Sequence, residues 1–149
     1  MKKMLYMVPC LLLLMSFIKW EPDFNRAKQV ASEKHELILL NFSGSDWSRP
    51  CKKLKNEFFR SDVFSQLADT SLILVNADFP KDKRNQLDVQ TMKQNNTLAA
   101  KYNPTGKFPY TLLLDPKGNV LKIWDGLPNE SAEEFSTEIK NIVYNSKQY

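Results

Sequence analysis

A short apolar run that passes through a polar turn into a helix constrains this chain more than any other stretch. The run at residues 37–42 reads Leu-Ile-Leu-Leu-Asn-Phe, which is too short for a helix and fits a central strand covered on both faces. Residues 43–49 are mostly polar and contain Gly44, so the chain turns there. Pro50 stands where a helix can begin, because the first helical turn does not use the donor that proline lacks. Apolar side chains then recur on one helix face: Cys51, Leu54 and Phe58.

The rest of the chain alternates between helical and strand patterns. In chain order, the expected elements are a helix at 21–34, the strand at 37–42, a helix from Pro50, a short helix after Ser61-Asp62, a strand at 71–77, a helix at 97–102, strands at 109–114 and 120–124, and a last helix after a capping box at 131–134. A strand, a helix and a second strand imply a right-handed crossover and a parallel pair. The turn residues at 115–119 instead join the last two strands as an antiparallel hairpin. The fold class is therefore α/β, with a mixed central sheet and helices on both faces.

Residues 79–96 form the most polar stretch and lack a clean apolar period. We expect a loop that contains some helix there. The helical pattern becomes convincing only at Thr97, and Asn103-Pro104-Thr105-Gly106 ends it.

The N-terminal residues 1–19 have the parts of an export signal. Lys2 and Lys3 form a basic start, and residues 4–18 are almost wholly apolar. This length suits the apolar part of a signal peptide and is short for a membrane span. The residues that follow make a poor cleavage site, so a signal peptide and an uncleaved membrane anchor both stay open. We expect an exported protein, periplasmic or on the outer face of a membrane, with one domain at residues 20–149.

Composition excludes several classes of function. The net charge of +4 includes three lysines that flank the first apolar run, and the remaining basic residues are scattered among acidic ones, which argues against a nucleic-acid partner. One histidine and two cysteines do not make a typical zinc site, so no metal is expected. No phosphate loop or dinucleotide fingerprint is present, and no cofactor is expected.

The order of elements, the turn that ends in Pro50-Cys51 and the later Phe108-Pro109 together resemble the thioredoxin superfamily. In particular, the chain is similar to exported bacterial thioredoxin-like proteins whose turn reads Phe-Ser-Gly-Ser-Asp-Trp-Cys-x-x-Cys. It matches that turn from Phe42 to Trp47 and again at Cys51. The resemblance covers roughly residues 36–145. It implies a thioredoxin fold with about four or five strands and a cis proline at Pro109.

Two departures from the family pattern concern its chemistry. Where the resemblance implies a nucleophilic cysteine, this chain has Ser48, so the turn reads Ser-x-x-Cys. Where many thioredoxins place a buried acid that moves protons, this chain has Asn41. A serine hydroxyl is not appreciably ionised at neutral pH and is a poor attacker of a disulfide, so ordinary dithiol turnover is not expected.

Three hypotheses stay open for the site. The domain binds extended-peptide or thiol-containing and disulfide-containing client proteins without turnover, or Cys51 acts as a one-thiol redox site, or Ser48 donates its hydroxyl to a bound thiolate. The catalytic positions are Cys51 and Ser48. The resemblance implies that the client contacts lie at Trp47, Arg49, Pro50, Phe108 and Pro109.

Overall fold

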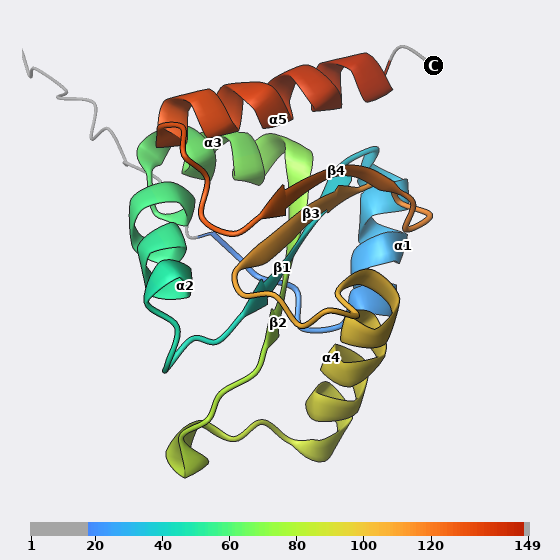
Figure 1. The fold of residues 1–149 in the computed structure, drawn as a ribbon. Coiled ribbons are helices and arrows are strands. Elements are labelled where there is room, and N and C mark those ends of the chain that lie inside the picture. The colour runs from blue at the N-terminus through green and yellow to red at the C-terminus, as the bar shows by residue number, and fades with distance from the viewer. Residues whose placement is uncertain (1–17, 148–149) are drawn as a thin grey trace, which may run out of the picture.

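The computed structural model describes residues 18–147, which build a four-stranded sheet between two layers of helices (Figure 1). The strand order is β2-β1-β3-β4. The predicted α/β class and mixed sheet are confirmed. The expected export segment lies outside the described residues except for Ile18 and Lys19. Within residues 18–147, no helix has the length and apolar character needed to span a bilayer.

The central strand β1 holds the sheet together. β1 covers Leu37–Ser43, and all seven of its residues are buried. It pairs in parallel with β2, Leu72–Asp78, and antiparallel with β3, Tyr110–Leu114. β3 in turn pairs antiparallel with the edge strand β4, Val120–Asp125, as the turn between them predicts. A strand with both edges paired and both faces covered is mostly apolar, which explains the apolar residues of β1; its two polar residues, Asn41 and Ser43, are hydrogen-bonded to side chains of neighbouring strands.

The helices divide between the two faces of the sheet. The helical elements are α1 at Phe24–Lys34, α2 at Arg49–Lys53, the π-helix η1 at Leu54–Phe59, α3 at Asp62–Ser71, the short 3₁₀-helix η2 at Lys83–Asn85, α4 at Val89–Tyr102 and α5 at Ala132–Ser146. α1 and α4 cover one face, where Phe24 and Leu98 pack with Ile38 and Leu40 of β1. η1, α3 and α5 cover the other, where Leu39 of β1 joins their core.

α4 begins eight residues earlier than the expected helix at Thr97, so that boundary was wrong. The Asp88 carboxylate caps the true start by accepting hydrogen bonds from the N–H groups of Gln90 and Thr91, both at 3.0 Å. The helix also buries a polar residue, Asn95, whose amide donates to the carbonyl of Asp78 at 3.0 Å. An amide on the buried face removes the apolar period that would have marked the first two turns.

The π-helix η1 was not expected either. Cys51, Leu54 and Phe58 are buried on one face, as their spacing predicts, and the adjacent Phe59 is buried as well. In a π-helix the hydrogen bonds run from residue i to residue i+5, which widens the turn. The wider turn brings both phenylalanines to the core, a result that strict α-helical spacing does not give.

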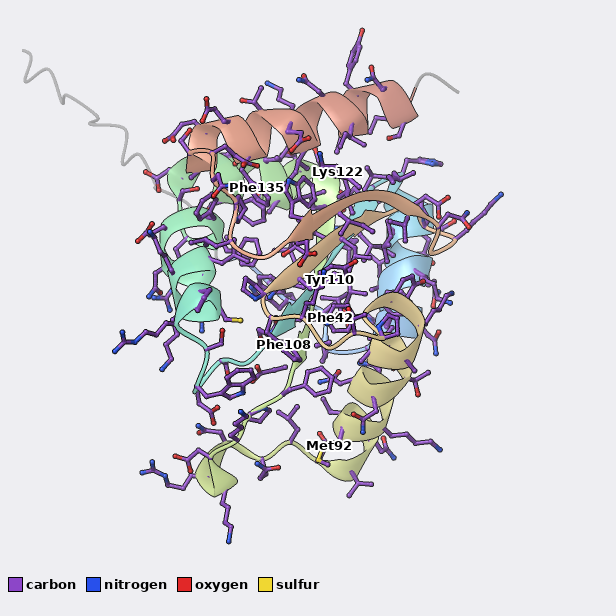
Figure 2. All side chains as sticks on the ribbon, viewed as in Figure 1. Phe42, Met92, Phe108, Tyr110, Lys122 and Phe135 are labelled. Atoms are coloured by element: carbon purple, nitrogen blue, oxygen red, sulfur yellow. The ribbon has the colours of Figure 1, made fainter. Side chains whose placement is uncertain are left out.

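Phe135 of α5 lies at the centre of an aromatic cluster beneath that helix (Figure 2). Its ring centroid is 4.9 Å from that of Trp124 and 5.6 Å from that of Phe58. The rings of Phe59 and Phe64 lie 6.4 and 6.1 Å away. This residue ties α5 to the π-helix and to the edge strand at once.

Replacing Phe135 with alanine should therefore lower the free energy of unfolding by about 3–5 kcal/mol, since a buried phenylalanine leaves a large cavity. Chemical denaturation measures this loss. Tyr144→Ala on the same helix is the control, because that ring is 67% exposed and its removal should change stability by less than about 0.5 kcal/mol. Equal losses in the two variants would contradict the packing described.

Candidate functional site

The turn after β1 brings Ser48 and Cys51 together at the start of α2. Ser48 is the N-cap of α2, and its Oγ accepts a hydrogen bond from the Cys51 N–H at 3.4 Å. The Cys51 Sγ in turn accepts from the Gly44 N–H at 3.4 Å. Both side chains are buried. Ser48 thus has a structural role at the start of α2, because an N-cap side chain satisfies a helix-end N–H group.

Two carboxylates fasten this turn to the loop after β2. Asp46 accepts hydrogen bonds from the N–H groups of Lys81 at 3.0 Å and Asp82 at 2.9 Å. The Lys81 N–H bond is the largest cause of the lowered pKa of Asp46. Asp78, at the end of β2, accepts from Ser43 Oγ at 2.8 Å and from the Ser45 N–H at 2.9 Å. Asp46 from the turn and Asp78 from β2 therefore fix the turn against the segment that follows β2.

An aromatic surface adjoins the turn, of which Trp47 is exposed, while Phe79 and Phe108 are half-buried and pack against the core. We call it the aromatic lip, and it consists of Trp47, Phe79 and Phe108. The ring centroids of Trp47 and Phe79 each lie 5.5 Å from that of Phe108, in edge-to-face contact. The Trp47 Nε1–H donates to the Phe79 carbonyl at 2.8 Å, and the Lys81 ammonium lies 4.0 Å from the Trp47 ring centroid. Trp47 is nevertheless 38% exposed, so the lip presents apolar area to solvent.

Gly44 is the position that allows Trp47 to lie flat against the turn. A Cβ on Gly44 would stand 2.3 Å from Cε2 of the Trp47 ring. The indole would have to move, and the lip would lose its first member. Glycine is required here for close approach of a side chain to the backbone.

The remaining predicted site residues lie around this surface. The Phe108–Pro109 peptide bond is cis, Pro109 is buried, and Phe108 lies in the loop that leads into β3 (Figure 2). Arg49 and Pro50 are exposed at the start of α2. Arg49 makes no hydrogen bond or ion pair with any residue between 18 and 147. Trp47 and Phe108 are thus brought together, while Arg49 and Pro50 face solvent beside them.

Asn41 lies in a hydrogen-bonded row of polar side chains across three strands. Thr111 Oγ1 donates to Asn41 Oδ1 at 2.9 Å, and Asn41 Nδ2 donates to Asn76 Oδ1 at 2.8 Å. Asn76 Nδ2 donates to Ser43 Oγ at 3.1 Å, and Ser43 continues the row to Asp78. The side chain at the position of the usual buried acid is therefore neutral and engaged on both its oxygen and its nitrogen. It supplies no ionisable group for proton transfer.

Asp78 and Phe79 are site residues that the sequence analysis did not single out for a role. The signal was present, because the segment Ala77-Asp78-Phe79-Pro80 follows a predicted strand that lies parallel to the one bearing the turn. The carboxyl ends of parallel strands meet at the same edge of a sheet. In the part of the chain that the structure describes, no group of three histidine, cysteine, aspartate or glutamate side chains could hold a metal ion.

The sheet topology, the turn and the cis proline define a thioredoxin-type domain. The sequence pattern of the Thioredoxin-like family matches residues 19–116, and the chain belongs to that family. The disulfide bond reductase DsbH of Chlamydia pneumoniae is 35% identical over 104 residues, which are 70% of this chain and 60% of that protein. The thioredoxin-related protein DsbJ of the same organism is 25% identical over 126 residues, 85% of this chain and 35% of DsbJ. The chain thus matches less than two thirds of the length of either relative.

Solved structures agree with this assignment. A structure of DsbH oxidoreductase matches with a TM-score of 0.76 over 85% of both chains, at 28% identity. A thioredoxin from Thermus thermophilus matches with a TM-score of 0.63 over 86% of this chain and 88% of that one, and its 16% identity supports the fold alone.

The carboxylate of Asp46 gives a pH-dependent prediction. Its pKa in the folded protein is below the ordinary value of 3.8, so its hold on the loop is complete above that value and is lost as the pH falls through the lowered pKa. We expect the amide signals of Lys81 and Asp82 to titrate together in acid, below the pH at which an unperturbed aspartate titrates, as NMR can follow. The Leu113 amide, in the core of the sheet, is the control for general unfolding. Titration at or above the ordinary value would contradict this geometry.

Proposed function

We propose that this domain is an exported thioredoxin-like module that binds extended-peptide or thiol-containing and disulfide-containing client proteins without ordinary dithiol turnover. The observation that carries the proposal is the aromatic lip, whose Trp47 ring stays exposed while Ser48 serves as a helix cap. Aromatic side chains supply much of the binding energy at protein interfaces. The surface proposed to bind clients is therefore distinct from Ser48 and Cys51, the residues that would carry the sulfur chemistry.

The second support is the loss of both chemical groups that turnover requires. The mixed disulfide of a thioredoxin-type cycle forms on the first thiol and is resolved by the second. Cys51 is a free, buried thiol, and the position that would carry its partner holds a hydroxyl. Asn41 carries a neutral amide, which cannot accept a proton as a buried carboxylate would.

Client binding should depend on Phe108. Replacing Phe108 with alanine removes the ring that joins the other two rings of the lip, and we expect affinity for an unfolded, thiol-blocked polypeptide to fall about 10-fold to 30-fold. Fluorescence anisotropy of the labelled polypeptide measures this. Ile123→Ala is the matched control, because Ile123 is an exposed apolar residue on the edge strand β4 and should leave the affinity unchanged. Equal affinities for wild type and Phe108→Ala would overturn the proposed site.

A one-thiol redox role for Cys51 is the second candidate function. It is favoured by the placement of Cys51, which lies within the first turn of α2, lines a cavity and has its sulfur facing the Gly44 N–H. A small alkylating reagent should then label Cys51 in the native protein. No labelling between mildly acidic and mildly alkaline pH would eliminate this candidate.

Ser48→Cys tests whether the nucleophile is the part that is missing. Because the turn and the cap position are both in place, the variant should gain the capacity to reduce a model disulfide repeatedly. An insulin reduction assay follows this gain, with Ser48→Ala as the control for loss of the hydroxyl alone. If a folded Ser48→Cys variant reduces no disulfide, then Asn41 as well as Ser48 prevents turnover.

Export rests on the pattern of residues 1–19. The basic start and apolar run support it, and so does similarity to proteins named for disulfide chemistry, since disulfides persist mainly outside the cytosol. A reporter that is active only outside the cytosol, fused after Lys147, should be active. An inactive reporter on a stable fusion would exclude export.

A further inference from the structure

A cavity of about 390 Å³ lies next to Cys51. It is bounded by the carboxyl ends of β1 and β2, by α2 and η1, and by the segment that precedes α1. We call it the Cys51 cavity. Trp47, Phe79 and Phe108 do not line it, so it is separate from the aromatic lip. Its volume is within the range of small-molecule binding sites.

Ile18, Trp20 and Phe59 form an apolar part of the Cys51 cavity, and another part is polar and uncharged. Asn41, Asn76 and Ser43, which belong to the hydrogen-bonded row across the sheet, line it. A side-chain amide has two N–H donors, and the row uses one donor of Asn41. Asn41 is only 5% exposed, and its second N–H has no partner among residues 18–147. A buried donor without a partner is costly, so an acceptor on a bound molecule would stabilise this side chain.

The rim of the cavity is cationic. Lys52, Lys55 and Arg60 line it, and no aspartate or glutamate does. None of the three forms an ion pair with a carboxylate within the described range 18–147. Lys52 donates to the Asp46 carbonyl and Arg60 to the Asn56 side chain, so both bond to neutral oxygen atoms. Like charges around a cleft concentrate its field and attract anions.

Lys55 and Arg60 lie at the two ends of the π-helix η1: Lys55 is its second residue, and Arg60 is the residue that caps its C-terminal end. Lys53 points elsewhere, because it pairs with Glu57 at 3.8 Å and does not line the cavity. π-turns are frequent at functional sites.

We propose that the Cys51 cavity binds a small organic molecule that carries carboxylate groups. The carboxylates face Lys52, Lys55 and Arg60, and a carbonyl or carboxylate oxygen accepts from the free N–H of Asn41. The bound molecule covers the Cys51 sulfur, which forms part of the cavity wall. This site does not depend on client binding at the aromatic lip, and either can fail without the other.

The probe for this site is S-methylglutathione, which has two carboxylates and no free thiol, so that its binding cannot be covalent. With the full chain in mild detergent, calorimetry should show saturable one-to-one binding that weakens as salt is added. Its diester, which lacks both carboxylates and keeps only the ammonium charge, should not bind. The double variant Lys55→Gln/Arg60→Gln should bind about tenfold more weakly, since each lost charge contributes modestly at an exposed rim.

Lys53→Gln is the matched control and should bind as wild type does, because Lys53 is a neighbouring lysine outside the cavity. Phe108→Ala should bind normally as well, which separates this site from the client site. Saturating probe should slow alkylation of Cys51 in the wild type and not in the double variant. Absence of saturable binding, equal weakening by Lys53→Gln, unchanged Cys51 alkylation, or equal competition by inorganic phosphate would each overturn the proposal.

Discussion

The burial of β1 on both faces is the constraint on which the rest of the structure depends. Because every residue of the strand is buried and both edges are paired, its one amide, Asn41, must find partners inside the sheet. It finds them in Thr111 and Asn76, and the row continues to Asp78. Asp78 then holds the turn that leaves the strand. The hydrogen bonds that satisfy Asn41 in the core thus continue through Asp78 to the turn that forms the site.

The shape of the site is held by contacts that involve no sulfur nucleophile. In this chain the Ser48 hydroxyl caps α2, while Asp46 and Asp78 hold the turn. None of these contacts needs a nucleophile. The aromatic lip depends on Gly44 and on the loop that Asp46 holds, which again involves no sulfur. A surface suited to binding is stable here without the dithiol.

Much of the fold follows from the sequence because the signals are local. The apolar run of β1, the hairpin of β3 and β4, and the capping box at Ser131 all act within a few residues. The start of α4 was missed because Asn95, a buried amide bonded to a distant carbonyl, takes the place of an apolar residue. The π-helix was missed because its wider turn depends on core contacts of Phe59 with residues far along the chain.

The candidate site likewise has parts that the sequence predicts and parts that it does not. The positions of Ser48, Cys51 and Phe108 could be predicted, since each lies in a short motif that resembles a known family. The network through Asp78 and the Cys51 cavity could not, because they exist only when β1, β2 and η1 lie together. Pairings between strands decide which polar groups meet, and residue spacing along one strand does not reveal them.

The most direct test of the central claim is to count turnovers of the wild-type protein on a model disulfide that releases a coloured thiol. With one reactive sulfur at Cys51 and a hydroxyl at Ser48, the account predicts that, with no other thiol present, Cys51 releases at most one equivalent of coloured thiol and keeps the other half of the model disulfide as a mixed disulfide. Release of two equivalents that is abolished in Cys51→Ala, with no mixed disulfide left on the protein, would contradict it.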